Sequence, residues 1–292
     1  MRCVRTSWRH DAPMPKPRAS VIQVTEPPRK LALITGASAG LGAQFARAYA
    51  ARGLDLALVA RRGERLEALA AELTAAHGIE AYPIVADLSE FEAERAVLEA
   101  VAARGRHVDV LVNNAGFSIP QSFAAVPWER QREFLMTLVV SACGLAHGVI
   151  APMIERGGGS IINVASLAGY APGAKGHTLY PGAKSLTIKF SEALDAEYRD
   201  RGIRVTAVCP GFTQTEFATA NGTQAIMDAS PRFFFQTAST VVEAAILANE
   251  AGRVIVIPGW HNRLAGSLLR HLPQGLVKRV VHAGAAKYHL EA

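Results

Sequence analysis

Short apolar runs alternate with helical patterns along residues 30–260 of this 292-residue chain. The first run, Leu31 to Thr35, is typical of a buried parallel strand, and apolar residues then recur at helical spacing between Phe45 and Ala50. A second apolar run, Leu54 to Ala60, follows that helix. This alternation predicts one α/β domain with a doubly wound parallel sheet and helices on both faces.

A glycine-rich turn joins the first strand to the first helix. The N-terminus of a helix is an anion site, and glycines let the backbone approach a pyrophosphate closely. The spacing is G-x-x-x-G-x-G rather than the commoner G-x-G-x-x-G. The βαβ unit of about 30 residues nevertheless favours a Rossmann-type nucleotide site. The residues expected to contact the cofactor in this turn are Gly36, Ser38, Gly40, Leu41 and Gly42.

Two arginines, Arg61 and Arg62, follow the second strand, where the ribose of a dinucleotide is recognised. A carboxylate there would hold the 2′-hydroxyl of NAD, whereas an arginine can form a bidentate pair with the 2′-phosphate of NADP. We therefore expect NADP(H) to be preferred over NAD(H). The alternative is that both arginines are surface charges at the start of a helix, paired with Glu64 and Glu67.

Tyr180 and Lys184 stand one helical turn apart, with their Cβ atoms about 5–6 Å from each other. A nearby cation favours the phenolate and so lowers the pKa of a tyrosine toward a range useful for acid–base catalysis. Because the same spacing occurs on many ordinary solvated helices, its meaning depends on the rest of the chain.

Further motifs complete a recognisable order. After the glycine turn come Asp87-Leu88, Asn113-Asn-Ala-Gly116, Ser166, Tyr180-Pro-Gly-Ala-Lys184 and Pro210-Gly-Phe-Thr-Gln-Thr215. Over roughly residues 30–260 the chain resembles the short-chain dehydrogenase/reductase family. The resemblance implies an NADP(H)-dependent oxidoreductase that interconverts an alcohol and a ketone or aldehyde by hydride transfer, and a homodimer or homotetramer.

The resemblance also implies a role for each motif. Ser166 would hydrogen-bond the substrate oxygen, Tyr180 would be the general acid–base, and Lys184 would hold the nicotinamide ribose while lowering the pKa of Tyr180. Asp87, with Leu88 beside it, would bind the adenine amino group. The other implied cofactor contacts are Asn114, Ala115 and Gly116 near the adenosine ribose, and Pro210, Gly211, Thr213 and Thr215 near the nicotinamide and its phosphates.

Val139 departs from the family pattern. Relatives commonly have an asparagine at this position, thirteen residues ahead of the proline matched by Pro152, and it supports a water-linked proton relay. No asparagine occurs between Asn114 and Asn163. An alternative from another class is therefore a nucleotide-binding scaffold or sensor with little catalytic activity.

Two smaller departures lie near the tyrosine. Ser166 and Tyr180 are fourteen positions apart where thirteen is common, which predicts one extra residue in the loop from Gly173 to Gly176. Pro181 is tolerated only in a first helical turn and disfavours helical geometry in the residue before it. We therefore expect Tyr180 at the start of its helix.

Composition is that of a globular chain, because half of the residues are hydrophobic. Three cysteines without paired spacing argue against a disulfide framework and favour the cytoplasm. The nine histidines show no H-x-x-x-H pair, so no metal is expected. The most apolar stretch, Leu138 to Ile154, is short for a membrane span and is predicted to be a buried or interface helix.

Positive charge is concentrated at the two ends of the chain. The central part of the sequence is net negative, so nucleic acid is not an expected partner. Residues 1–29 contain five prolines and are predicted to be a disordered arm or a non-native extension upstream of Met14, with a transit peptide as a weaker possibility. The predicted catalytic domain then comprises residues 30–261.

Residues 262–292 form a basic extension in which Leu264, Leu268 and Leu272 share one helical face before Pro273. Two interpretations are open. The extension is either a pair of short helices that packs on the body or on a neighbouring subunit, or an amphipathic element that rests on a membrane surface. In the second case the polar face would contain Arg270, Lys278 and Arg279.

The segment from Thr215 to Phe235 is expected to form a lid over the substrate. Its apolar side chains either bind a small apolar alcohol or carbonyl compound or pack within the lid itself. They are Phe217, Ile226, Met227, Phe233, Phe234 and Phe235.

Overall fold

The computed structural model describes residues 29–279 except 174, 177, 222–234 and 274. The predicted arm apart from Arg29 lies outside the described residues, as do the end of the basic extension and the lid residues Ile226, Met227, Phe233 and Phe234.

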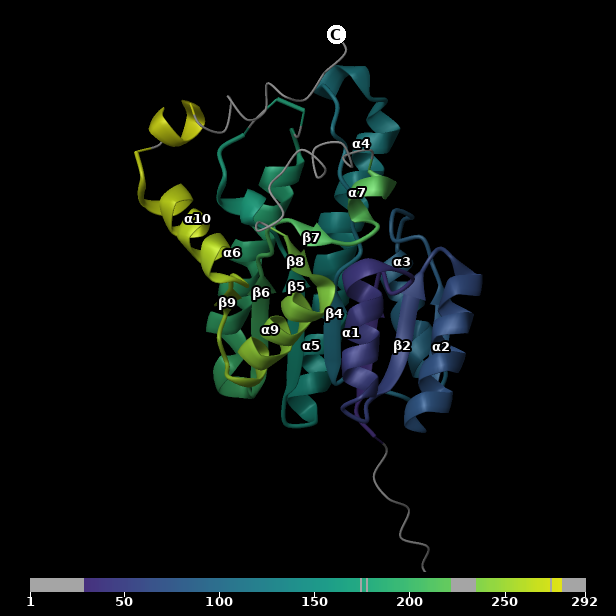
Figure 1. The fold of residues 1–292 in the computed structure, drawn as a ribbon. Helices are drawn as coiled ribbons and strands as arrows, with labels where there is room; N and C mark the ends of the chain where they lie inside the picture. Colours follow the sequence, from purple (N-terminus) through teal and green to yellow (C-terminus); the bar gives the residue numbers. More distant parts are fainter. Residues whose placement is uncertain (1–28, 174, 177, 222–234, 274, 280–292) are drawn as a thin grey trace, which may run out of the picture.

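A seven-stranded sheet forms the centre of the molecule, in the order β3-β2-β1-β4-β5-β6-β9 (Figure 1). Every pairing in it is parallel, as the apolar runs predicted. The strands are β1 (Leu31–Thr35), β2 (Asp55–Ala60), β3 (Ala81–Val85), β4 (Val110–Asn113), β5 (Gly159–Val164), β6 (Ile203–Val208) and β9 (Ile255–Val256).

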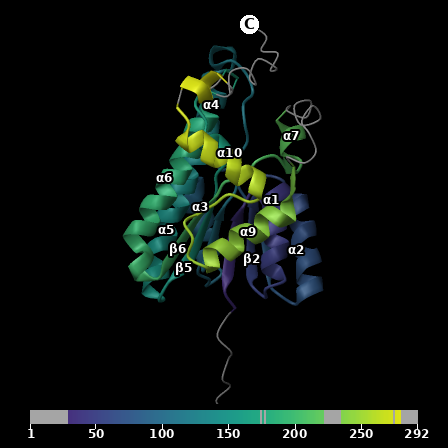
Figure 2. The ribbon, with the colours of Figure 1, turned by 60° about the vertical axis from the view of Figure 1, so that its left-hand side comes forward.

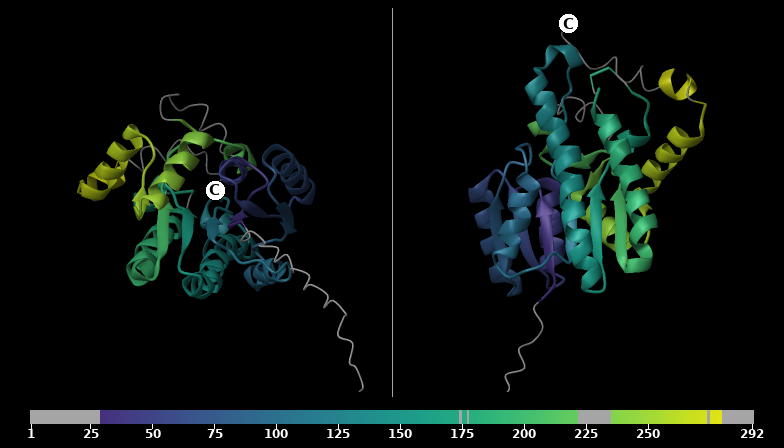
Figure 3. Two further views of the ribbon diagram at one scale, coloured as in Figure 1. Left: turned by 90° about the horizontal axis from the view of Figure 1, so that it is seen from below. Right: turned by 180° about the vertical axis from the view of Figure 1, so that it is seen from behind.

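Helices cover both faces of the sheet, which confirms the predicted doubly wound Rossmann-type fold (Figure 3). Successive side chains of a strand point to opposite faces. Ala32 and Ile34 accordingly enter one hydrophobic core, and Leu31 and Leu33 enter the other. The first core is closed by α1 (Gly40–Ala50), α2 (Gly63–His77) and α9 (Ala238–Glu250), and the second by α3 (Ala93–Ala102), α5 (Ser141–Glu155) and α6 (Tyr180–Tyr198).

Shorter elements lie mainly around the carboxyl edge of the sheet. They are η1 (Phe123–Ala125), α4 (Trp128–Leu135), the π-helical turn η2 (Met136–Val140), η3 (Leu167–Tyr170), η4 (Arg199–Arg201), β7 (Thr213–Gln214), α7 (Phe217–Ala220), β8 (Gln236–Thr237) and α10 (Trp260–His271).

The helical stretch Trp128–Glu155, made of α4, η2 and α5, is long and apolar enough to cross a membrane by length and composition alone, with a mean hydropathy of 2.0 in its most apolar window. Leu145, Val149 and Met153 of α5 are buried in the second core. Part of this stretch is therefore a core helix, as predicted for Leu138 to Ile154.

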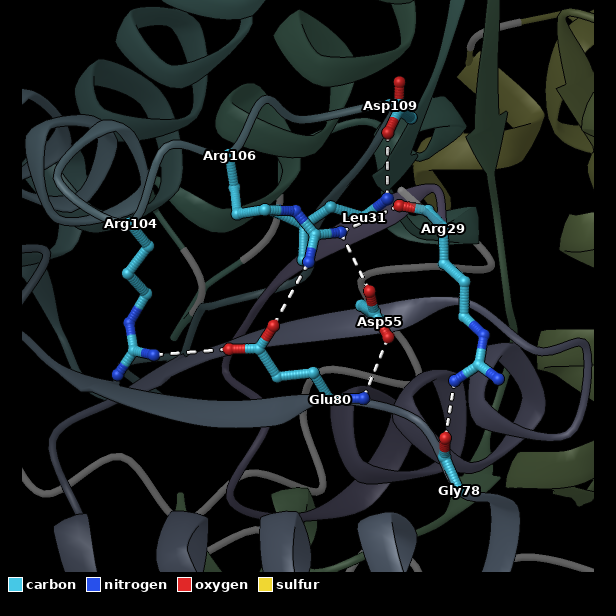
Figure 4. Close-up of polar contacts among 8 residues, drawn as sticks. All are labelled: Arg29, Leu31, Asp55, Gly78, Glu80, Arg104, Arg106 and Asp109. Atoms are coloured by element: carbon cyan, nitrogen blue, oxygen red, sulfur yellow. Dashed lines mark hydrogen bonds and ion pairs between the residues drawn. The ribbon is translucent and has the colours of Figure 1, made fainter. Parts of the chain in front are cut away.

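A cluster of charged side chains closes the amino ends of the strands (Figure 4). Arg106 Nη2 lies 2.9 Å from Asp55 Oδ2, and Arg106 Nη1 lies 3.2 Å from Glu80 Oε2. Asp55 Oδ1 accepts a hydrogen bond from the Glu80 N–H at 2.8 Å. Arg29, expected in the arm, joins this cluster because its carbonyl accepts a hydrogen bond from Arg106 at 2.8 Å. The amino edge is thus occupied by structural contacts, and the opposite edge carries the candidate site.

Candidate active site

The predicted site residues follow the carboxyl ends of six adjacent strands. The chain proceeds from β1 toward β3 on one side and from β4 toward β6 on the other, so the winding reverses between β1 and β4. Ligands of open α/β sheets bind outside the strand ends at such a switch point. Gly36 follows β1 and Asn114 follows β4, so these two predicted cofactor residues lie on either side of it.

The glycine turn is shaped by close backbone contacts. Gly36 and Gly40 have φ values of +67° and +55°, in the left-handed region that favours glycine. A Cβ on Gly42 would lie 2.2 Å from the carbonyl oxygen of Gly36, and one on Gly36 would lie 2.7 Å from Asn114 Nδ2. Helix α1 then begins at Gly40 with no acidic residue in its first turn and no cap from a described side chain. These residues fit a dinucleotide, because the first N–H groups of α1 are placed to bind its pyrophosphate.

Thr35 ties the loop after β4 to the glycine turn, a role that sequence reasoning missed. Its Oγ1 accepts hydrogen bonds from the backbone N–H groups of Asn114 at 2.9 Å and Ala115 at 3.0 Å. The Asn114 side chain in turn donates to the Thr35 carbonyl at 2.8 Å. The sequence hint of this role was a polar residue, Thr35, at the end of an otherwise apolar run. Gly116 continues this loop against Leu138.

The arginines after β2 lie at the outer end of the glycine turn. Arg62 donates two hydrogen bonds to Ser38 Oγ, at 3.1 and 3.0 Å, and its Nη1 is 3.6 Å from Glu216. Arg61 Nη1 is 3.5 Å from Asp87 Oδ2. The partners suggested from sequence proximity, Glu64 and Glu67, were wrong, because residues after β3 and β6 reach the same edge of the sheet. A third arginine, Arg65, also pairs with Glu216, at 2.8 Å.

Asp87 is held in its charged form. Burial alone would raise the pKa of its carboxyl, but hydrogen bonds from Ser89 and the nearby Arg61 guanidinium bring that pKa below its usual value. Leu88, expected among the cofactor contacts, has its side chain buried in the second core. Its carbonyl accepts a hydrogen bond from Ser141 Oγ at 2.7 Å, so Leu88 anchors this loop from within.

Ser166, Tyr180 and Lys184 lie together at the end of β5. Tyr180 is the first residue of α6, as Pro181 predicted. Ser166 Oγ accepts a hydrogen bond from the Ala168 N–H at 3.1 Å and is itself hydrogen-bonded to Tyr180. Lys184 is buried; its Nζ donates to the Val164 carbonyl at 2.7 Å and lies 5.7 Å from the centre of the Tyr180 ring.

The pKa of Tyr180 differs from the expectation. Burial raises the pKa of this phenol above its usual value, and the hydrogen bond with Ser166 only partly opposes the rise. Burial also lowers the pKa of Lys184 to about 8. The expected net lowering of the tyrosine pKa is therefore wrong, since loss of hydration outweighs the hydrogen bond that favours the phenolate. Tyr180 is a protonated phenol at neutral pH.

Val139 belongs to an apolar wall beside Tyr180. It lies in the π-helical turn η2 and packs with Phe134, Leu138 and Ala183. Phe134 and Tyr180 also line a small cavity, with Ile119, Leu179 and three polar residues, Gln121, Gln131 and Thr178. The position that the family pattern assigns to an asparagine is thus part of a hydrophobic surface here. The extra residue predicted between Gly173 and Gly176 falls in a loop whose residue 174 lies outside the described residues.

The loop after β6 approaches the glycine turn from the other side. A Cβ on Gly40 would lie 3.3 Å from the Cβ of Thr215, and the Thr213 hydroxyl donates to the Gly211 carbonyl at 3.2 Å. Pro210, just before it, accepts a hydrogen bond at its carbonyl from the Leu167 N–H at 3.0 Å. The motif from Pro210 to Thr215 therefore contacts η3 at one end and the glycine turn at the other.

The predicted lid leaves and rejoins the body at one place. Thr213 of β7 pairs with Gln236 of β8 in a short parallel ladder. At this base the rings of Phe212 and Phe235 stack with their centres 5.6 Å apart. Phe235, which sequence analysis assigned to the substrate or to lid packing, thus packs at the foot of the segment.

Comparison with known proteins agrees with this geometry. The sequence profile of the short chain dehydrogenases matches residues 30–226. The chain belongs to the short chain dehydrogenase family. It is 35% identical over 192 residues to an uncharacterized oxidoreductase of Myxococcus xanthus, covering 66% of this chain and 75% of that protein. It is also 35% identical over 223 residues to a very-long-chain 3-oxoacyl-CoA reductase of Anas platyrhynchos, covering 74% of this chain and 67% of that protein.

A solved relative supports the fold. The short-chain dehydrogenase from Sphingobium yanoikuyae in complex with NADPH aligns with a TM-score of 0.74 and 31% identity, over 85% of this chain and 95% of that one. This short chain dehydrogenase is therefore an oxidoreductase acting on CH–OH groups, built on a Rossmann-type domain. Within the described ranges, no three His, Cys, Asp or Glu side chains gather where they could hold a metal ion.

Proposed function

We propose that this short chain dehydrogenase is an NADP(H)-dependent oxidoreductase that interconverts an apolar alcohol and its ketone or aldehyde, with Tyr180 as the general acid–base. One observation carries the proposal. A protonated Tyr180 phenol, hydrogen-bonded to Ser166 and one turn from the buried Lys184, lies at the carboxyl edge of the sheet together with the glycine turn.

Each side chain has a distinct task. A bound nicotinamide supplies the hydride for reduction of the carbonyl carbon or accepts it in the reverse direction. In reduction, Tyr180 donates its phenolic proton to the substrate oxygen while the Ser166 hydroxyl hydrogen-bonds the same oxygen. A positioned acid of this kind contributes about 10²–10⁴-fold to the rate. The ammonium of Lys184 stabilises the phenolate that forms, because an opposite charge nearby favours the ionised state.

The preference for NADP(H) rests on the end of β2. Arg61 and Arg62 occupy the place of the carboxylate typical of NAD sites, and Ser38 is within hydrogen-bond distance of Arg62. Both ion pairs of these arginines are exposed and so are weakly held. Either guanidinium is therefore available to a 2′-phosphate. The NADPH complex of the Sphingobium yanoikuyae relative supports the same choice.

The class of substrate follows from the wall beside Tyr180. The small cavity at Tyr180 also contains the polar side chains of Gln121, Gln131 and Thr178. The hydrophobic side chains that pack in the same cluster as Tyr180 favour an apolar group next to the reacting carbon. They are Phe117, Ile119, Phe134, Leu135, Leu138, Val139 and Leu179. A homodimeric or homotetrameric state, a cytoplasmic location and independence from metal stay predictions of the sequence.

The test is NADPH oxidation against aldehydes and ketones of increasing chain length. Tyr180→Phe keeps the ring packed and removes the transferable proton. Turnover should fall by about 10²–10⁴-fold with NADPH affinity nearly unchanged. Tyr198→Phe, at the other end of α6, is the matched control and should retain full activity.

Two results would contradict the proposal. A Tyr180→Phe protein with undiminished turnover would show that another group transfers the proton. Tight NADPH binding by the wild type without turnover of any compound in the panel would instead favour the scaffold or sensor that Val139 suggested.

A further inference from the structure

Helix α10 turns its leucines away from the domain. On its inner face Asn262 and Gly266 are buried, and the Arg270 guanidinium lies 5.0 Å from the centre of the Tyr170 ring. These three residues are four apart. A residue two positions further along a helix points about 200° away, which is nearly the opposite direction.

The outer face of α10 is apolar, because each inner residue is followed two positions later by a leucine. Leu264, Leu268 and Leu272 are 55%, 46% and 37% exposed, and Trp260, one turn earlier, is 68% exposed. We call these four residues the leucine stripe. Helices of soluble domains normally bury their apolar side, so this orientation is reversed. The open interpretation that the extension packs on the body holds for the inner face of α10, whereas its leucines remain 37–55% exposed.

Positively charged residues accompany the leucine stripe in the sequence. Arg263 is exposed next to Leu264, and Lys278 and Arg279 are exposed beyond the end of α10. The extension from residue 262 to 292 contains five lysines or arginines against one acid, Glu291. Leucines with a tryptophan at one end and cations alongside are typical of a helix that lies in the plane of an anionic membrane surface.

We propose that the leucine stripe of α10 binds the surface of a membrane that contains anionic lipids. A second copy of the chain fits less well, because a twofold contact between two stripes would bring the same cations together. An anionic lipid surface offers the opposite charge at every point. Figure 1 shows α10 at the left-hand edge of the molecule, on the outer side of α6, and Figure 2 shows the same helix with that side brought forward.

The contact would also place the membrane near the active site. Gly266 packs against Leu167, and Arg270 lies over Tyr170, so α10 rests on η3. Element η3 follows Ser166 directly. A substrate dissolved in the lipid would therefore arrive on this side of the pocket; this consequence alone depends on the proposed function, and the binding itself does not.

The experiment is vesicle flotation with the full-length protein, at low salt, on phosphatidylcholine vesicles with and without phosphatidylserine. The wild type should float with the phosphatidylserine vesicles and much less with phosphatidylcholine alone. Transferring a half-exposed leucine into lipid contributes roughly threefold to tenfold in affinity, so L264Q/L268Q should lose about ten- to a hundredfold. R263Q should lose roughly fivefold.

Leu247→Gln is the matched control, because Leu247 of α9 is 48% exposed but is no part of the leucine stripe. It should float like the wild type. The L264Q/L268Q protein should keep its melting temperature and NADPH affinity, since both side chains point outward. Added salt should weaken flotation of the wild type by screening the cations.

Three outcomes would overturn the proposal. The wild type could fail to bind phosphatidylserine vesicles at low salt. L264Q/L268Q could float as well as the wild type, which would point to the apolar stretch Trp128–Glu155 instead. Finally, the wild type could fail to float while analytical ultracentrifugation shows that L264Q/L268Q has lost self-association. That pair of results would show that a second copy covers the leucine stripe.

Discussion

The two arginines after β2 offer the sharpest test of cofactor choice. Arg61→Gln removes a cation whose ion pair, among the described residues, is an exposed contact with Asp87, 3.5 Å away. Such a pair is worth about 0–1 kcal/mol, so little is lost when Arg61 turns to a ligand. A charge-assisted contact with the 2′-phosphate contributes about 1.5–3 kcal/mol. The net effect is about 0.5–3 kcal/mol, or roughly twofold to 150-fold in NADPH affinity.

The same change should leave NADH almost untouched, because NADH has no 2′-phosphate. Arg62→Gln should act in the same direction but less strongly. In the wild type Arg62 must give up two hydrogen bonds to Ser38 and its contact with Glu216 to reach the phosphate. The ratio of NADPH to NADH affinity therefore reports the phosphate contact, while the NADH affinity alone reports damage to the rest of the site.

Parallel calorimetric titrations with NADPH and NADH provide the measurement. Arg65→Gln is the control, since Arg65 lies on the same helix and contacts Glu216 at 2.8 Å but is no part of the predicted phosphate contact. Its affinity ratio should match that of the wild type. The reasoning is refuted if Arg61→Gln, Arg62→Gln and the double variant all keep the wild-type NADPH affinity and the wild-type ratio.

Three further variants probe the glycine turn, the buried lysine and the opposite edge of the sheet. Gly42→Ala places a Cβ 2.2 Å from the Gly36 carbonyl oxygen, so the turn must shift, and titration should show NADPH and NADH weakened together by at least about tenfold. Burial lowers the pKa of Lys184 from 10.5 to about 8, so the unfolded chain holds that proton more readily and stability rises with pH between these values. Lys184→Met removes the cost of burying this ammonium. In urea unfolding the variant should therefore exceed the wild type in free energy of unfolding by more below pH 8 than above pH 10.5. Its NADPH affinity should fall. Asp55→Asn breaks a pair with side chains only 8% and 14% exposed and should lower the free energy of unfolding by about 3 kcal/mol, with turnover at saturating substrate unchanged.

The strands and the glycine turn were predictable because their signals are local. A parallel sheet buried on both faces needs continuous apolar runs, and Leu31 to Thr35 is such a run. The second strand was predicted from Leu54 and begins at Asp55. Asp55 carries the buried ion pair with Arg106, so a charged residue inside an apolar run had a structural cause that only the fold shows.

Partners from distant parts of the chain were not predictable. Proximity in sequence suggested Glu64 and Glu67 for the arginines after β2, yet Asp87 and Glu216 are the residues in contact. These come from the ends of two other strands, and only the strand order brings them to the same edge. The contact of Thr35 with the loop after β4 has the same origin.

The direction of the Tyr180 pKa shift shows a second limit of sequence reasoning. The spacing of Tyr180 and Lys184 correctly indicates that the two groups are neighbours, and a cation next to a phenol lowers its pKa when both are hydrated. How much water each group retains depends on packing from elsewhere in the fold. Phe134 and Leu138 from the α4 and η2 region cover the tyrosine, and burial then dominates for both groups.

Helix α10 shows why periodicity predicts a face but not its direction. The spacing of Leu264 and Leu268 marks an apolar side, yet the side that meets the domain is the one with Asn262. The Asn262 amide donates to Gln236 at 2.8 Å and to the Pro258 carbonyl at 3.1 Å. Its Oδ1 lies so close to Gly211 that a Cβ on that residue would be only 2.4 Å from it. Turning the leucines inward would leave these buried polar groups unpaired, at a cost of about 1–3 kcal/mol each. The contacts of Asn262 with Gln236 and the Gly211 loop thus turn the polar side of α10 toward the domain, and its leucines are left exposed.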